Sequence, residues 1–185
     1  MNRADNPALK RRLVELLTER SVRRGQFTLA SGRESDLYID ARLTTLHAEG
    51  ASIIASLVLD RLKPEVVGIG GPVTGADPIV GAVVGASWGR GRPIHGFMVR
   101  KEPKGHGLMQ WLEGRGNLPN AAPVCVVEDT VTTGGSLLRA IERVQEAGLQ
   151  VVQVVCVVDR QEGGAERIAA GGYRLEALVT RAELG

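Results

Sequence analysis

The sequence predicts an α/β protein with a central, mostly parallel sheet flanked by helices. Apolar runs without alternation, such as V-C-V-V at 124–127 and V-V-Q-V-V-C-V-V at 151–158, are typical of strands buried on both faces of a parallel sheet. Several such runs lead through a polar or glycine-rich loop into a segment of helical periodicity, which indicates βαβ units. The loops after the strands should therefore gather at the carboxyl edge of the sheet, where such folds bind ligands.

Length and composition bound the class of protein. At 185 residues the chain should form one domain with a sizeable core. Hydrophobic residues make up 43% and charged residues 24%, as in soluble globular proteins, and a net charge of +2 is too small to indicate a nucleic-acid partner. Aromatic residues are only 3%, which disfavours a base-stacking surface. We find no run long enough to span a membrane and no export signal, so the cytoplasm is expected.

The N-terminal part should form a small hood of about residues 1–45 over a core of about residues 46–185. Residues 7–20 have the spacing of an amphipathic helix. Short strands are expected at 27–29 and 37–39, around the polar turn S-G-R-E-S. A second helix is expected at 47–62, ended by Pro64.

The core elements follow in order. We expect strands at 66–69, 94–99, 124–127, 149–158 and, at the sheet edge, 175–179, with helices at 78–88, 136–148 and 165–170. Cys125 and Cys156 lie within apolar runs and should be core residues, not ligands or a disulfide. The glycine-rich loop G-G-P-V-T-G at 70–75 is either a second anion site or a structural turn.

The segment of residues 100–120 is longer than the usual connection between a strand and a helix. It begins with the charged run R-K-E-P-K-G-H-G. Its prolines and glycines oppose regular structure, so we expect a flexible loop that carries Arg100, Lys101, Lys104 and His106. Such a loop is either a catalytic lid or a solvated charged segment.

The stretch P-V-C-V-V-E-D-T-V-T-T-G-G-S at 123–136 organises the chain. After its strand come Glu128 and Asp129, then a loop whose Gly134 and Gly135 allow an anion to approach the start of a helix. The two acids would repel that anion, but carboxylates accept hydrogen bonds from vicinal hydroxyls. A phosphate beside a diol is a ribose 5-phosphate. The alternative is an ordinary strand-loop-helix turn capped by a serine.

This stretch resembles the phosphoribosyl pyrophosphate (PRPP) signature of type I phosphoribosyltransferases. It fits neither the Walker A pattern nor the Rossmann G-x-G-x-x-G. The resemblance implies the type I phosphoribosyltransferase (Rossmann-like) fold. It also implies a PRPP site formed by Glu128, Asp129, Thr130, Val131, Thr132, Thr133, Gly134, Gly135 and Ser136.

Two further segments resemble orotate phosphoribosyltransferases. The first, F-T-L-A-S-G-R-E-S-D-L-Y-I-D-A-R at 27–42, resembles the family's hood and implies that Tyr38 and Ile39 lie near the base. Tyr38 is alternatively a half-buried strand aromatic. Many members of the family carry a lysine where this chain has Ala30. Some members also carry a lysine in the glycine-rich loop, where this chain has Val73 or Thr74. Contacts made by that loop should therefore come mainly from backbone N–H groups.

The second segment is the charged run, which resembles the family's catalytic loop. The resemblance implies a homodimer in which this loop reaches the neighbouring subunit's site. By position, Arg100, Lys101, Lys104 and His106 would bind the pyrophosphate of PRPP, and Lys104 or His106 would assist its departure. Cations are needed there because negative charge develops on the leaving oxygens.

Arg160 follows the strand at 149–158 and should lie at the ligand-binding edge of the sheet. Its planar guanidinium suits a carboxylate such as that of orotate. By resemblance, Arg160 and Thr132 would bind orotate. The alternative is an ion pair of Arg160 with Glu162 or Glu166.

Together these motifs predict an orotate phosphoribosyltransferase, a pentosyltransferase of pyrimidine nucleotide synthesis that converts orotate and PRPP to orotidine 5-monophosphate and pyrophosphate. Mg²⁺ is implied by the pyrophosphate and would be held mainly by substrate oxygens and water, since no dedicated protein cage is visible. The alternatives are a purine phosphoribosyltransferase and a non-catalytic regulator that senses PRPP or nucleotides. Neither a nucleic acid nor a membrane is an expected partner.

Overall fold

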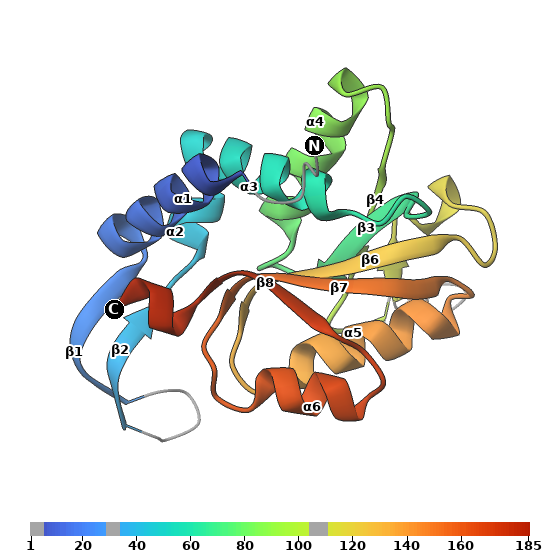
Figure 1. Ribbon diagram of the computed structural model, residues 1–185. Helices are drawn as coiled ribbons and strands as arrows, with labels where there is room; N and C mark the ends of the chain where they lie inside the picture. The colour runs from blue at the N-terminus through green and yellow to red at the C-terminus, as the bar shows by residue number, and fades with distance from the viewer. Residues whose placement is uncertain (1–5, 29–33, 104–110) are drawn as a thin grey trace.

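The structure is a computed structural model that describes residues 6–28, 34–103 and 111–185 (Figure 1). A six-stranded sheet has the order β5-β4-β3-β6-β7-β8. All neighbouring strands are parallel except β5, which is antiparallel to β4. The strands are β3 (Gly68–Pro72), β4 (His95–Val99), β5 (Leu112–Glu113), β6 (Pro123–Val131), β7 (Gln150–Asp159) and β8 (Leu175–Thr180). The predicted mostly parallel sheet, with its last strand at the edge, is therefore confirmed.

Helices cover both faces of this sheet. In Figure 1, α3 (Ala48–Arg61) and α4 (Asp77–Gly89) lie on one side, and α5 (Gly135–Glu146) and α6 (Gly164–Ala170) lie on the other. The side chains of β6 alternate between the two layers, because Cys125 packs with the α3 and α4 layer and Val126 packs with the α5 and α6 layer. Cys125 and Cys156 are buried, free thiols, as predicted.

The N-terminal segment packs against the core and against the last helical turn. It contains α1 (Pro7–Arg20), the antiparallel hairpin of β1 (Val22–Thr28) and β2 (Glu34–Ile39), and α2 (Arg42–Thr45). The short 3-10 helix η2 (Arg181–Leu184) holds this segment: Lys10 Nζ lies 2.7 Å from Glu183 Oε1, and Arg24 donates to the carbonyl of Leu184 over 3.2 Å. The boundary predicted for the hood stays a prediction.

Several predicted boundaries were wrong. β6 continues past residue 127 to Val131, because β7 is long enough to pair with it up to Asp159. Glu128 and Asp129 are therefore strand residues and not part of a turn. β3 begins two residues later and ends three residues later than predicted, at Pro72, so Gly70, Gly71 and Pro72 of the predicted loop are strand residues. β1 begins at Val22, five residues earlier than predicted. β5 and the 3-10 helix η1 (Arg115–Asn117) lie within the segment predicted as a loop.

The sequence of β3, G-I-G-G-P, has few side chains because its neighbours lie very close. A Cβ atom on Gly71 would lie 1.9 Å from the carbonyl oxygen of Val127 on β6, and one on Gly70 would lie 2.3 Å from the ring of Phe97 on β4. Any larger residue would clash at these two positions, so glycine is required there despite its low strand propensity.

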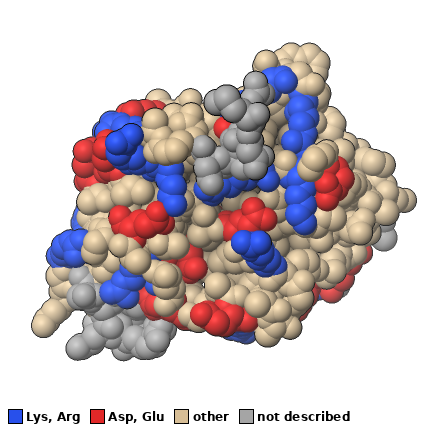
Figure 2. Space-filling model, viewed as in Figure 1, with Lys and Arg blue, Asp and Glu red and all other residues tan. Residues whose placement is uncertain are grey.

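Charge is distributed without a dominant sign on the face drawn in Figure 2, where Lys and Arg side chains alternate with Asp and Glu side chains.

Among the described residues, no helix is both long enough and apolar enough to cross a membrane.

We predict that Gly71→Ala destabilises the fold by about 2–4 kcal/mol, because the methyl group would collide with backbone that cannot move without breaking the β3–β6 ladder. Urea unfolding followed by circular dichroism measures the effect. Gly81→Ala is the matched control: Gly81 lies in α4, and outside its own helix no described residue has an atom within 4 Å of its Cβ position, so the substitution should stabilise the protein by about 0.5–1 kcal/mol. Equal effects of the two substitutions would contradict this account.

Candidate active site

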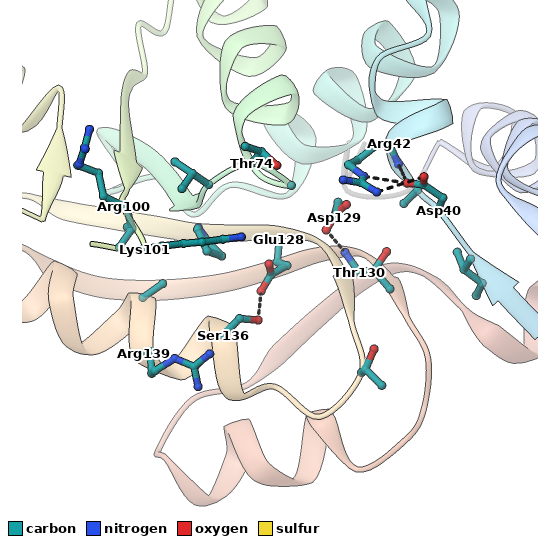
Figure 3. A pocket seen from close by; sticks show the side chains of 18 of the residues that line it. Asp40, Arg42, Thr74, Arg100, Lys101, Glu128, Asp129, Thr130, Ser136 and Arg139 are labelled. Atoms are coloured by element: carbon teal, nitrogen blue, oxygen red, sulfur yellow. Dashed lines mark hydrogen bonds and ion pairs between the residues drawn. The ribbon is translucent and has the colours of Figure 1, made fainter. Parts of the chain in front are cut away.

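A pocket of about 690 Å³ opens at the carboxyl edge of the sheet, between the hood and the core (Figure 3). Its walls come from the end of β2, from α2, from the segments after β3 and β4, from the end of β6, from α5 and from the segment after β7. The lining residues used below are Tyr38, Ile39, Asp40, Arg42, Val73, Thr74, Gly75, Arg100, Lys101, Trp111, Glu128, Asp129, Thr130, Thr132, Ser136, Arg139, Arg143 and Arg160.

Glu128 lies near the centre of the pocket with only 8% of its surface exposed. Its Oε2 accepts a hydrogen bond of 2.9 Å from the hydroxyl of Ser136 (Figure 3). Burial raises the pKa of Glu128 to about 7, and the neighbouring charge of Asp129 acts in the same direction. A carboxyl group with this pKa changes its charge near neutral pH.

Asp129 lies beside it, under the loop after β3. Burial also raises the pKa of Asp129, while the backbone N–H of Thr130, which donates to Asp129 Oδ1 over 2.7 Å, and the charge of Arg42 oppose the rise. A Cβ atom on Gly75 would lie 2.5 Å from Asp129 Oδ1, so only glycine allows this loop to approach so closely. Thr130 has a buried hydroxyl with no hydrogen-bond partner among the described residues.

The loop between β6 and α5 has the geometry of an anion cradle. Gly134 has φ 73°, and it begins α5 without a side-chain cap. Ser136 donates to Glu128 and does not cap the helix, so the alternative of an ordinary serine-capped turn is wrong. Val131 is 2% exposed and packs in the core, so only its backbone can reach a ligand.

The remaining signature residues divide in two. Thr132 lines the pocket, whereas Thr133 lies in the loop, Gly134 is the N-cap of α5 and Gly135 is its first residue. On the opposite wall, Thr74 lines the pocket after a cis peptide bond from Val73.

The charged run contributes Arg100 and Lys101 to the pocket wall. Arg100 Nη1 lies 3.0 Å from Glu113 Oε1. The side chain of Lys101 extends in the direction of Glu128 in Figure 3. The predicted residues Lys104 and His106, like Ala30, lie outside the described residues.

The hood supplies Tyr38 and Ile39. The Tyr38 ring packs against Phe27 with centroids 5.6 Å apart, yet 40% of its surface stays exposed. Ile39 is largely buried. Tyr38 thus packs on Phe27, as a half-buried strand aromatic would, and also lines the pocket, and its contact with a base stays a prediction.

Arg160 enters the pocket from the segment after β7 and is only 5% exposed. Its Nε and Nη2 both lie 2.9 Å from Glu162 Oε1, and Nη2 lies 3.5 Å from the carbonyl oxygen of Leu37. The structure therefore contains the ion pair with Glu162 that was one interpretation, and it also places Arg160 where the other interpretation needs it. Among the described residues, Arg160 forms no ion pair with Glu166.

Comparison with known proteins identifies the family. The family model for the phosphoribosyl transferase domain matches residues 93–172. Orotate phosphoribosyltransferases of Thermosynechococcus vestitus and Nostoc sp. are 46% and 42% identical to this chain, covering 95% and 98% of it and 93% and 87% of their own length. This chain belongs to the orotate phosphoribosyltransferase family.

Solved structures of the family agree with this result. The Mycobacterium tuberculosis orotate phosphoribosyltransferase in complex with Fe(III) dicitrate has a TM-score of 0.84 at 42% identity, and its complex with PRPP has a TM-score of 0.80 at 39% identity. Each comparison covers 96% of this chain and 99% of the other. The predicted family and fold are confirmed.

Sequence reasoning missed several residues of this orotate phosphoribosyltransferase pocket. On α5, Arg139 and Arg143 lie three and seven positions after Ser136, and this helical spacing could have found them. The guanidinium of Arg143 lies 3.9 Å from the centroid of the Trp111 ring, where a cation–π interaction holds both side chains.

The hood of this orotate phosphoribosyltransferase also contributes a charged pair that was missed. Arg42 donates to Asp40 over 2.9 and 3.2 Å and thereby holds the pKa of Asp40 below its usual value. Arg42 lies near Asp129 in Figure 3. No sequence pattern indicated that Arg42 would approach Asp129 across the pocket.

We predict that Glu128→Gln stabilises the protein at pH 8 by about 2–3 kcal/mol, because the native carboxyl must ionise in a buried place. A carboxyl with a raised folded-state pKa contributes stability below its unfolded pKa and loses it as pH rises through the folded pKa of about 7. The gain should therefore shrink toward pH 5. Urea unfolding at both pH values measures it, and Glu142→Gln, on the exposed face of α5, should show no such dependence.

Proposed function

We propose that this chain transfers the phosphoribosyl group of PRPP to orotate, giving orotidine 5-monophosphate and pyrophosphate in pyrimidine nucleotide synthesis. The observation that carries the proposal is that one pocket combines two adjacent carboxylates, a glycine-bounded helix start and a buried guanidinium. A solved relative of the family was obtained in complex with PRPP, which supports the same ligand here. The cytoplasmic location stays a prediction.

In this proposal the carboxylates of Glu128 and Asp129 accept hydrogen bonds from the ribose hydroxyls. The 5-phosphate binds at the loop from Thr130 to Ser136, where backbone N–H groups and the helix dipole favour an anion. The unpartnered hydroxyl of Thr130 is a further donor for this ligand. Hydroxyl donors of a bound ribose would favour the ionised form of Glu128 and thereby lower its raised pKa.

The chemical step needs cations at the other end of the ribose. The bond between the anomeric carbon and the pyrophosphate oxygen breaks with its electron pair on oxygen, and N1 of orotate, after losing its proton, forms the new bond to that carbon. We assign Arg100, Lys101, Lys104 and His106 to the pyrophosphate, with Lys104 or His106 assisting its departure. Such groups act by stabilising charge that develops in the transition state. Binding by Arg100 would require its guanidinium to leave or share Glu113.

The base should lie between the hood and the segment after β7. Arg160 would bind the orotate carboxylate, Thr132 another part of the ring, and Tyr38 and Ile39 would pack beside it, since all four line the same pocket. A neutral purine offers no carboxylate to this guanidinium.

Mg²⁺ is proposed as the cofactor. Among the described residues there is no cluster of three or more His, Cys, Asp or Glu side chains that could hold a metal by itself. The hard oxygens of Glu128 and Asp129 suit Mg²⁺ as partial ligands, with substrate oxygens and water completing its shell. When bound, the ion would neutralise charge on the pyrophosphate.

We also propose a homodimer in which the loop at about residues 100–120 serves the neighbouring subunit. This arrangement rests on the resemblance of the charged run to the family's catalytic loop. It would bring Lys104 and His106 to a pocket whose acids belong to another chain.

We predict turnover of orotate with PRPP and none of adenine, hypoxanthine or xanthine, because only orotate presents a carboxylate to Arg160. Release of pyrophosphate from each base measures this. Turnover of a purine without orotate would favour a purine phosphoribosyltransferase, and no turnover of any base would favour a regulator.

We predict that mixing Lys104→Ala with Asp129→Asn protein restores about a quarter of wild-type activity, because a loop shared across a dimer gives each hybrid one intact site. Each variant alone should be slower by about 10²-fold or more. The activity is measured after subunit exchange. If the loop serves its own subunit, mixing restores nothing.

We predict that EDTA abolishes turnover without changing the melting temperature, because the metal is held by the substrate and not by a protein cage. Activity should return with added Mg²⁺. A fall in melting temperature on chelation would indicate a structural metal and contradict this assignment.

A further inference from the structure

The guanidinium of Arg160 is anchored along one edge. Arg160 Nε donates a hydrogen bond of 2.9 Å to Glu162 Oε1, Nη2 lies 2.9 Å from the same oxygen, and the side chain of Arg160 is only 6% exposed. A buried charge of this kind is costly unless an opposite charge or hydrogen bonds compensate it. Glu162 supplies that compensation in the structure.

This pairing leaves the other edge of the guanidinium for a ligand. Nη1 has no hydrogen-bond partner among the described residues, and Nη2 has beyond Glu162 only the long 3.5 Å contact to the carbonyl oxygen of Leu37. A guanidinium can bind one carboxylate through Nε and Nη2 and a second through Nη1 and Nη2, in one plane. The ion pair of Glu162 with the Nε and Nη2 edge therefore fixes the orientation of the Nη1 and Nη2 edge.

The backbone segment that carries Glu162 is held in place by hydrogen bonds of its neighbours. The N–H of Gln161 donates to Asp159 Oδ1 over 2.8 Å, and the N–H of Ala182 donates to Gln161 Oε1 over 3.0 Å. Gln161 has φ 55° and Gly163 has φ 88°, so the chain turns sharply on both sides of Glu162. The segment after β7 is thus a fixed support and not a free loop.

We propose that Glu162 is a positioning residue that orients Arg160 for the carboxylate of the pyrimidine substrate. The inference rests on the proposed function, because it assigns a role toward the same base. Glu162 fixes the plane of the guanidinium and supplies its counter-charge, and orotate then completes the coordination. Because Nη2 also contacts the carbonyl of Leu37, the same orientation ties the base site to strand β2 of the hood.

The test is steady-state kinetics of the full chain with orotate and PRPP, comparing Glu162→Gln with Glu166→Gln. Glu166 is the matched control because it is an exposed glutamate on α6, outside the pocket lining. We expect Glu162→Gln to raise KM for orotate about tenfold or more, while kcat and KM for PRPP change less than about twofold, as for a contact made in both ground and transition states. Glu166→Gln should match the wild type.

A double-mutant cycle separates positioning from a general structural effect. Glu162→Gln should raise KM for orotate much less when Arg160 is already alanine, because it acts through that side chain. The melting temperature is recorded for each variant. Should Glu162→Gln fail to fold, Glu162→Asp, which retains the charge on a shorter side chain, is expected to raise KM for orotate by a smaller factor.

The outcomes are distinguishable. An unchanged or lower KM for orotate in a folded Glu162 variant would overturn the positioning role, as would an equal effect in the Arg160→Ala background. Failure of the wild type to use orotate would overturn the proposed function, and this inference with it.

Discussion

The pairing of β6 with β7 out to Val131 and Asp159 is the constraint on which the site depends. It carries two adjacent acids to the end of a buried strand, where solvation of their charge is poor and their pKa values rise. The fold tolerates this because Ser136 donates to one carboxylate and the backbone of Thr130 donates to the other. The two buried carboxylates would be stabilised further by the hydroxyl donors of a ligand. Some folding stability is thus exchanged for affinity toward that ligand.

The glycines of β3 and of the loop after it serve the same arrangement from the opposite side. Gly71 lets β3 lie against the backbone of Val127, and Gly75 lets the following loop approach Asp129. Larger residues would separate the two strands and widen the pocket. The spacing of the walls is thus set by backbone contact, which is less adaptable than contact between side chains.

Much of this arrangement could be predicted from the sequence. Unbroken Val-rich runs indicated the buried strands, and the acids and glycines after Val127 indicated a segment that the structure places in and beside the pocket. The predicted end of that strand was wrong because ladder pairing with β7, a long-range property, extends it. The predicted bounds of β3 were wrong because the close packing of Gly70 and Gly71 against the neighbouring strands outweighs the low strand propensity of glycine. Trp111 was missed because its partner Arg143 is distant in sequence, and Arg42 was missed because the Asp129 whose charge it faces is distant too.

The anchoring of the hood by η2 has a consequence for the order of folding. Lys10 and Arg24 are translated early, whereas their partners Glu183 and Leu184 are translated 173 and 160 residues later. Contacts of such wide sequence separation form late, since a long loop must close before they are gained. Because β8 ends at Thr180, directly before η2, the last strand of the sheet and the anchor of the hood leave the ribosome together, so the hood is fastened only when the sheet is complete.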